Sequence, residues 1–474
     1  MNPMDAPFGA NDAEDERLRL ERTSAARRWT DGSGRPWDLV IPPTVYPPRE
    51  DTDLLASALT ALGPGGGRTA FEVGVGSGAL LLQLAADGWN VGGCDVHPYA
   101  VAASRQVLAE HGHRVRVMES DIRDLDATHL AGADLVVWNT PYLPAVNPNE
   151  AHLGPLEEAS LSDPIPEGSG IALLGMLANL PVRPQRRALL VLREDGMDGL
   201  RMAATARGWC SSVERRLSFD DGEHLVVAVL EPAWPHAKHA TVKSTGSTNA
   251  DLLSGERTVG ESLRAEQQTE GRGRRAASWA SERGDLTASW VIHDGSSPMP
   301  AHGLLQAACA LAAKDVLLDV SGLREDAVLL KWPNDLIVDL DGLGKVGGWL
   351  IESRQQGRRT RVVAGLGLNL TPGSPTVDGT PRAFLEGQNA EEVRRALTTR
   401  LCSRLASLST PLGRRHLSEE AVVAYQASSQ RLGLEDLEGK SLVPEGLDPH
   451  GNLIVKEHNE ALTDLDHVQW RSWP

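Results

Sequence analysis

Short apolar runs alternate with stretches of helical periodicity from residue 68 to about residue 232. The apolar runs are TAFEVGV, NVGGCDV, RVRVMES, ADLVVWNTPY, RALLVL and HLVVAVL, and the helical stretches include GALLLQLAADG and AVAASRQVLAEHG. Strands that alternate with helices need crossover connections, which produce a mostly parallel sheet. The first half of the chain is therefore predicted to form an α/β domain.

The alternation breaks near residue 233 at PAWPHAKHA, where two prolines and the loss of an apolar period indicate a linker. Beyond it, strand-like runs such as LTASWVIHD and RTRVVAGLGLNL flank a long helix through LLQAACALAAKDVLLDV. This order predicts an α+β domain with a hairpin that turns at Asp341 and Gly342. The final segment, SLVPEGLDPHGNLIVKEHNEALTDLDHVQW, separates short strands by turn residues, which favours a small barrel.

These patterns divide the chain of 474 residues into four parts, and a chain of this length suits two or three domains. The parts are a flexible N-terminal segment 1–30, a first domain 31–234, a second domain 235–430 and a C-terminal barrel 431–474.

The composition limits the expected cellular location of the protein and the classes of partner that it can bind. The formal net charge of −17 makes nucleic acid a poor default partner, because a bound anion must then be held by local positive charge. The four cysteines are scattered without a CxxC pair, no apolar run approaches a membrane span, and the N-terminus lacks a signal-peptide core. We expect a cytoplasmic protein that does not span a membrane.

The stretch FEVGVGSG places Glu72, Gly74, Gly76 and Gly78 where a strand turns into a helix. Glycines allow close approach to a ligand there, and the helix start offers unpaired N–H groups. Asp95 ends the next strand, where a carboxylate can accept ribose hydroxyls, and Asp121 follows the third strand, where an adenine ring would lie. Any one of these could be a tight turn or a solvated acid. The ordered set resembles an S-adenosylmethionine-dependent methyltransferase, which implies a seven-stranded Rossmann-like fold.

The fourth strand ends in NTPY, from Asn139 to Tyr142, which resembles the [ND]PP[YFW] motif of methyltransferases that act on planar nitrogens. An amide nitrogen is a weak nucleophile because its lone pair is delocalised. The Asn139 carboxamide and a following carbonyl can accept its two hydrogens, and Tyr142 can pack on the flat group. Asn139 is also a candidate contact with S-adenosylmethionine. Asn-Thr-Pro can also form an ordinary turn, and Thr140 in place of the first proline is expected to loosen the loop.

The upstream stretch VYPPREDTDLL resembles HemK-type protein glutamine methyltransferases, especially those that modify the GGQ glutamine of release factors. The resemblance covers roughly residues 35 to 232. It implies that this stretch helps to cover the cofactor, with Pro48, Glu50, Asp51 and Thr52 as candidate contacts, and that a release factor is the partner. Two alternatives stay open: a nucleic-acid amino group as acceptor, or a degenerate module that presents or regulates the second half.

The stretch GRGRR concentrates Arg272, Arg274 and Arg275 on a glycine-rich loop of an acidic chain. Such a loop can fold over bound anions and exclude water. A solvated basic loop or a nucleic-acid patch would account for the peptide taken alone.

The blocks STGSTNADLL, AEQQTEGRGRR, KWPNDLIV, GKVGG and GLGLN follow one another in the order found in biotin protein ligases. This resemblance extends over about 230 residues and implies two steps. The biotin carboxylate attacks the α-phosphate of ATP to give biotinyl-5'-AMP and release pyrophosphate. A lysine of a biotin carboxyl carrier protein then attacks the acyl carbon and releases AMP. The implied contacts with biotin and the adenylate are Ser247, Thr248, Asn249, Gln268, Gly271, Arg272, Gly273, Arg274 and Arg275.

The later blocks imply the catalytic groups. Lys345 matches the lysine that touches both the biotin carboxylate and the α-phosphate, which makes it the principal electrophilic catalyst, assisted by Arg274. Asn369 matches an adenine contact. The block beneath ATP is Lys331, Trp332, Pro333, Asn334 and Asp335, with Trp332 packing and Asp335 near Mg²⁺ or the acceptor lysine. Taken singly, Trp332 or Asn369 is more often structural.

We therefore expect an enzyme with two activities, a biotin–[biotin carboxyl-carrier protein] ligase and an N-methyltransferase. Its cofactors and substrates would be S-adenosylmethionine, ATP, biotin and Mg²⁺, the metal arriving with ATP and not at a protein-only site. No helix-turn-helix precedes the ligase part, so specific DNA binding is not expected. The sequence is compatible with a homodimer.

Overall fold

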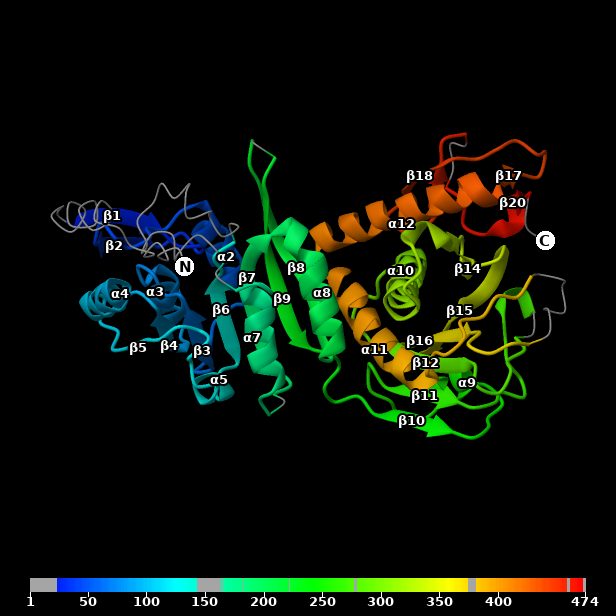
Figure 1. Cartoon of the computed structure of the whole chain (residues 1–474), viewed down its shortest axis with the longest axis horizontal. Helices are drawn as coiled ribbons and strands as arrows, with labels where there is room; N and C mark the ends of the chain where they lie inside the picture. Colours follow the sequence, from blue (N-terminus) through cyan, green and yellow to red (C-terminus); the bar gives the residue numbers. More distant parts are fainter. Residues whose placement is uncertain are drawn as a thin grey trace, which may run out of the picture. The chain divides into compact units, whose positions relative to one another are not determined.

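The chain divides into two compact units, Met1–Pro232 and Ala233–Pro474, shown in Figure 1. The computed structural model describes residues 24–142, 163, 165–181, 183–220, 222–276, 279–373, 381–457 and 461–471. In this part of the chain, no helix has both the length and the apolar character needed to cross a membrane.

The first unit is built on a seven-stranded sheet, which confirms the predicted Rossmann-like class. Its strands, in spatial order, are β5 (Arg116–Glu119), β4 (Asn90–Asp95), β3 (Thr69–Val73), β6 (Leu135–Asn139), β7 (Arg187–Arg193), β9 (His224–Pro232) and β8 (Trp209–Ser218). The first five are parallel and the last two antiparallel to their neighbours. The strand order reverses between β3 and β6. In open α/β sheets, ligands bind at the carboxyl ends of the strands beside such a reversal.

Helices cover both faces of this sheet, and the strands alternate between two cores. In β6, Leu135 and Val137 join the core beneath one set of helices, while Val136 and Trp138 join the other. The first set comprises α2 (Glu50–Ala61), α3 (Ala79–Ala86) and α4 (Pro98–Glu110), and the second comprises α5 (Thr128–Ala131), α7 (Ser169–Ala178) and α8 (Met197–Ala206), preceded by the 3₁₀ turn η1 (Glu194–Gly196).

The folded part of the first unit begins earlier than the sequence predicted. Residues 1–23 of the segment expected to be flexible lie outside the described residues, but Ala25–Thr30 forms strand β1, paired with β2 (Pro36–Ile41). Trp29 anchors this hairpin because its ring is buried and its indole N–H donates to Asp53 Oδ1 of α2 at 2.8 Å. The predicted start of the first domain at residue 31 therefore leaves out strand β1, which belongs to the folded unit.

The second unit contains another seven-stranded sheet, in which only β10 and β11 are parallel. The turn between β14 and β15 contains Asp341 and Gly342, which confirms the predicted hairpin. The strand order is β10 (His239–Val242), β11 (Ser262–Ala265), β12 (Leu286–Gly295), β16 (Arg359–Leu368), β15 (Leu343–Gln356), β14 (Asp335–Asp339) and β13 (Val328–Lys331).

Three long helices share one large core with this sheet, and the short helix α9 (Thr248–Leu253) contributes to a smaller core with β11, β12 and β16. The long helices are α10 (His302–Ser321), α11 (Ala390–Ser407) and α12 (Pro411–Leu432), and the 3₁₀ turns of the unit are η2 (Arg274–Ala276), η3 (Glu325–Ala327) and η4 (Leu465–His467).

The C-terminal residues form two small sheets, and the predicted barrel is not confirmed for the described residues. Strand β17 (Leu434–Asp436) pairs with β20 (Val468–Trp470), and β18 (Pro444–Leu447) pairs with β19 (Leu453–Val455). Apolar side chains of these strands, such as Leu434, Leu453 and Val468, belong to the same core as α10 and α12. The segment therefore packs onto the larger core of its unit.

The linker PAWPHAKHA is anchored at its start. A Cβ on Gly260 would lie 2.3 Å from Cγ of Trp234, so the indole rests directly on this glycine, and Trp234 packs against the core of the second unit. The following residues, Pro235 and His236, are exposed. The exposed joint predicted from the sequence is therefore shorter than the full stretch.

Candidate functional site

The glycine turn after β3 has the geometry that the sequence predicted. Gly74, Gly76 and Gly78 have φ angles of 67°, 49° and 81°, a region that side chains with a Cβ rarely adopt. Gly78 is the N-cap of α3, and the Gly76 N–H donates to Asp95 Oδ2 at 2.8 Å. Asp95 thus holds the turn from the end of β4.

Glu72 contributes a buried acceptor beside this turn. Its side chain is 2% exposed, and Oε2 has no hydrogen-bond partner among the described residues. Burial, and to a lesser degree the charge of Asp95, raises the pKa of Glu72 well above its ordinary value. Burial also raises the pKa of Asp95. Carboxyl groups perturbed in this way, gathered at the ends of parallel strands, are typical of ligand sites.

Asp121 lies just beyond β5, where the sequence placed it, but its carboxylate already has a partner. Arg123 donates to its two oxygens at 2.9 and 2.7 Å, and these hydrogen bonds lower the pKa of Asp121. An adenine contact through this carboxylate would have to be shared with Arg123.

The NTPY loop begins at the end of β6 and is firmly attached. The Oδ1 atom of Asn139 is buried and has no partner among the described residues. Thr140 is 4% exposed and its hydroxyl donates to the Val191 carbonyl of β7. The expectation that Thr140 loosens the loop is therefore wrong, because its hydroxyl makes a bond that proline could not make.

The stretch VYPPREDTDLL, which is predicted to cover the cofactor, lies against the glycine turn. The Tyr46 carbonyl is 3.7 Å from the position of a Cβ on Gly76. Pro48 is buried and Glu50 is exposed at the start of α2. Asp51 is 3% exposed and accepts hydrogen bonds from Thr52, Tyr46 and Tyr142. Its carboxylate is directed at the NTPY loop.

A buried polar network surrounds the start of α9 in the second unit. Ser247 is its N-cap, and the backbone N–H and hydroxyl of Thr248 donate to Gln268 Oε1 at 2.8 and 3.0 Å. Sequence reasoning missed Ser289, whose hydroxyl lies 2.7 Å from that of Thr248 and donates to Asn249 Oδ1 at 2.6 Å. The available signal was the polar alternation in LTASWVI, since Thr287 and Ser289 interrupt a buried strand.

Two glycines of GLGLN let side chains rest on β16. A Cβ on Gly365 would lie 2.3 Å from Asn249 Oδ1, and one on Gly367 would lie 2.1 Å from the indole of Trp279. Positions two apart on a strand share one face, so Asn249 and Trp279 lie along the same side of the sheet. Trp279 was not among the predicted contacts.

Lys345 lies beside Trp279, with Nζ 5.8 Å from the ring centre. Asp335 sits between two ammonium groups: its Oδ1 is 2.7 Å from Lys345 Nζ, and its Oδ2 is 3.2 Å from Lys331 Nζ. The Lys345 side chain is 21% exposed and that of Lys331 only 7%, so Lys345 is the more accessible charge. Trp332 is 5% exposed and packs in the core.

The arginines of GRGRR are held by carboxylates of the same unit. Arg274 pairs with Asp464 at 2.7 Å, and Arg275 pairs with Asp466 at 2.6 Å. Burial raises the pKa of Asp464, but the Leu465 N–H and both arginines outweigh this and lower it. The two ends of the loop are joined by the backbone N–H of Trp279, which donates to the Gly271 carbonyl at 2.9 Å. Arg272 is looser, 4.0 Å from Glu352.

Asn369 has a structural position. It is 2% exposed, its amide donates to the carbonyls of Lys345 and Ala383, and its Oδ1 accepts from Arg382 at 2.7 Å. An adenine contact through this amide would require one of these bonds to be exchanged. Arg382, which the sequence did not single out, also pairs with the buried Asp285.

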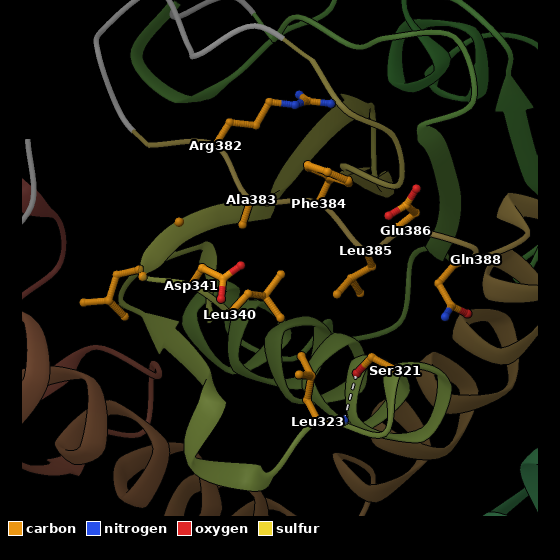
Figure 2. Close-up of a pocket in the computed structure, with 13 residues that line it drawn as sticks. Ser321, Leu323, Leu340, Asp341, Arg382, Ala383, Phe384, Leu385, Glu386 and Gln388 are labelled. Carbon is orange, nitrogen blue, oxygen red and sulfur yellow. Dashed lines mark hydrogen bonds between the residues drawn. The ribbon is translucent and has the colours of Figure 1, made fainter.

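A hollow of about 580 Å³ adjoins the strand that carries Lys345 (Figure 2). It is bounded by the β14–β15 turn, the end of α10 and residues 382–388, and Gly344 forms part of its wall. In Figure 2 the Arg382 guanidinium extends away from Leu340 and Leu323. Its partners are Asn369 and Asp285, as described above. A Cβ on Gly344 would lie 2.7 Å from that of Ala383, so glycine is required here.

Among the residues with described positions, no group of three or more His, Cys, Asp or Glu side chains is arranged to hold a metal ion. Asp335, the acid proposed to lie near Mg²⁺, has both oxygens engaged by lysines.

A known family model matches part of each unit. Residues 70–153 match the model described as methyltransferase domain, and residues 240–369 match the biotin/lipoate A/B protein ligase family. The chain joins a methyltransferase domain to a biotin/lipoate ligase domain. The site around β3 and β6 therefore belongs to the methyltransferase domain, and the site around Lys345 to the ligase domain.

Curated relatives match parts of each domain. The release factor glutamine methyltransferase of Rhodospirillum rubrum is 33% identical over 113 residues, 23% of this chain and 34% of the relative. The ribosomal RNA small subunit methyltransferase C of Alcanivorax borkumensis is 34% identical over 93 residues, 20% of this chain and 28% of the relative. Biotin–protein ligase 1, chloroplastic, of Arabidopsis thaliana is 42% identical over 76 residues, 15% of this chain and 20% of the relative. The chain thus spans about a third or less of each relative's length.

Proposed function

We propose that the chain is a bifunctional protein-modifying enzyme. The ligase domain joins biotin to a lysine of a biotin carboxyl carrier protein through biotinyl-5'-AMP. The methyltransferase domain transfers a methyl group from S-adenosylmethionine to a protein glutamine, that of the GGQ loop of a release factor. Both protein substrates are met in the cytoplasm, which is the location we propose.

The observation that carries the ligase assignment is the placement of Lys345. Adenylation brings the biotin carboxylate against the α-phosphate of ATP, and two anions approach only if positive charge lies between them. The Lys345 ammonium is partly exposed, held by Asp335 and adjacent to Trp279. Trp279 and Asn249 lie along one face of β16, so the polar network at α9 and the lysine line the same side of the sheet.

The network at α9 fits the other end of biotin. A ureido ring offers two N–H donors and a carbonyl acceptor. The buried Ser247 and Thr248 supply hydroxyl groups, and the half-buried Gln268 supplies an amide. The arginine loop would close over the adenylate and keep water from the acyl phosphate while the acceptor lysine attacks. Because both oxygens of Asp335 are engaged by lysines, the charge of the two anions is neutralised by Lys345 and not by a metal ion bound to Asp335.

The methyltransferase assignment rests on Asn139 Oδ1. This buried acceptor has no partner among the described residues. It lies at the end of β6, which pairs with β3, the strand that leads into the glycine turn. A planar N–H of the acceptor would satisfy it. The similarity to a release factor glutamine methyltransferase supports a glutamine amide as that group.

A second candidate acceptor is an exocyclic amino group of RNA or DNA. It is favoured by the similarity to a ribosomal RNA methyltransferase, and such a group would satisfy Asn139 Oδ1 equally well. A third possibility is a domain that binds cofactor but methylates nothing. The test offers purified enzyme a release factor, its GGQ Gln→Ala variant, and ribosomal RNA. Methylation of the wild-type release factor alone supports the proposal, and methylation of RNA or equal labelling of both proteins overturns it.

A further inference from the structure

The Asp51 carboxylate connects two segments of the methyltransferase domain that the sequence keeps far apart. Its Oδ2 accepts hydrogen bonds from the Tyr46 hydroxyl at 3.1 Å and from the Tyr142 hydroxyl at 3.4 Å. Tyr46 belongs to the stretch that covers the glycine turn, whereas Tyr142 closes the NTPY loop. Asp51 itself is the second residue of α2 and is 3% exposed.

The carboxylate has little capacity left for a ligand. Its Oδ1 accepts from the Thr52 N–H at 2.6 Å and the Thr52 hydroxyl at 3.2 Å, so four donors face a group with about four acceptor sites. The family resemblance assigned Asp51 to the cofactor, but its oxygens are occupied within the protein. The observed contacts point toward the acceptor side of the site instead.

We propose that Asp51 is a positioning residue for methyl transfer, which fixes the Tyr142 ring against the planar acceptor and couples it to the segment over the cofactor turn. This rests on the proposed function, in which Tyr142 packs on the acceptor. The 3.4 Å contact is long for a hydroxyl and a carboxylate, and such contacts tighten when a site is filled. Occupation of the cofactor side should therefore be felt at Tyr142 through Asp51.

The two tyrosines are suited to remain donors. Burial, followed by the charge of Asp51, raises the phenol pKa of both Tyr46 and Tyr142 far above the ordinary value. The Arg49 guanidinium, 5.0 Å from the Tyr46 ring centre, also restrains this side of the cluster. Both hydroxyls thus stay protonated and directed at Asp51 across the physiological pH range.

The contact can be tested without any acceptor, because the chain contains only four tyrosines, Tyr46, Tyr99, Tyr142 and Tyr425. The full chain labelled with 3-fluorotyrosine should give four ¹⁹F resonances, assigned by single Tyr→Phe variants. Asp51→Asn should shift those of Tyr46 and Tyr142 and leave those of Tyr99 and Tyr425 in place. S-adenosylhomocysteine should move the Tyr142 resonance in the wild type and fail to move it in Asp51→Asn. An unchanged Tyr142 resonance in Asp51→Asn would overturn the proposal.

Kinetics then separate positioning from simple structural support. With the methyl acceptor identified, Asp51→Asn should lower kcat about tenfold or more, while cofactor affinity by calorimetry stays within about threefold of the wild type. Tyr142→Phe should lower kcat too, and Asp51→Asn should add little in that background, because residues that act through one another are not additive. Additive losses, or a matching loss of cofactor affinity, would show a merely structural role.

The matched control is Asp53→Asn, on the same helix, which alters only the acceptor of the Trp29 indole N–H. It should leave kcat and the Tyr142 resonance unchanged. If the wild type methylates no acceptor, the proposed function fails while the resonance experiment still decides whether Asp51 couples the two segments.

Discussion

The two sites meet their ligands in opposite ways. In the methyltransferase domain, Glu72 Oε2 and Asn139 Oδ1 are buried acceptors without partners among the described residues. In the ligase domain, Lys345, Arg274 and Arg275 are all paired with carboxylates of the protein. Ligands at the first site add hydrogen bonds, whereas anions at the second must replace existing ion pairs. The first site should therefore respond to the loss of an acceptor, and the second to the balance of charge.

The largest effect is expected from Lys345→Ala. The variant removes the accessible ammonium needed as the carboxylate approaches the phosphate, so pyrophosphate exchange should fall at least about a hundredfold, the scale lost with one preorganised charge contact. The matched control is Lys314→Ala, which removes a lysine of α10 that pairs with the exposed Glu325 of η3, and this variant should retain exchange. Near wild-type exchange in the Lys345 variant would refute the assignment.

At the other site, Asn139→Ala should separate turnover from cofactor binding. Glu72, Asp95 and the glycine turn lie on β3 and β4, so affinity for S-adenosylmethionine should change little. Turnover should fall about a hundredfold, because the acceptor nitrogen loses a preorganised contact. Calorimetry and initial rates measure the two quantities. A parallel loss of affinity and turnover would place Asn139 in the cofactor site instead.

The sequence predicted what depends on local pattern. The apolar run ADLVVWNTPY predicted the strand β6, which the structure places between two cores. The glycines Gly74, Gly76 and Gly78 predicted a tight turn, whose positive φ angles favour glycine. It could not predict the partners of charged groups. Arg274 and Asp464 are 190 residues apart, and Tyr142 and Asp51 are 91 apart, so only tertiary packing brings them together. For the same reason the pattern of short strands in the C-terminal segment gave no sign that they share a core with α12, and the predicted barrel is not confirmed for the described residues.

The ion pairs of the arginine loop provide a smaller and more graded test of the comparison. If ATP must displace Asp464 and Asp466, the double Asp→Asn variant should lower the KM for ATP about two- to fivefold, the scale of partly exposed pairs. Its KM should also depend more on salt, because ATP then binds arginines that carry net charge and no longer replaces one anion by another. Initial rates of pyrophosphate exchange between low and high ionic strength provide the measurement. A raised KM would mean that the pairs hold the arginines in their working position.

The smallest effect concerns the cost of a buried acceptor without ligand. The native pKa of Glu72 is raised above the ordinary 4.5, so the native state keeps a proton that the unfolded state releases as pH rises. The contribution of Glu72 to stability is thus fully present below about 4.5 and is lost as pH rises toward the native pKa. Glu72→Gln resembles the protonated acid and escapes this loss. Without cofactor, its melting temperature should match the wild type at pH 4 and exceed it by at least about 2 °C at pH 8, since each kcal/mol shifts a domain of this size by about that much.

Affinity for S-adenosylmethionine should fall in the same Glu72→Gln variant, because hydrogen-bond donors of the ligand would meet the Glu72 carboxylate. A variant less stable than the wild type at pH 8 would show that Glu72 is already satisfied within the protein, and the contrast between the two sites would then rest on Asn139 alone.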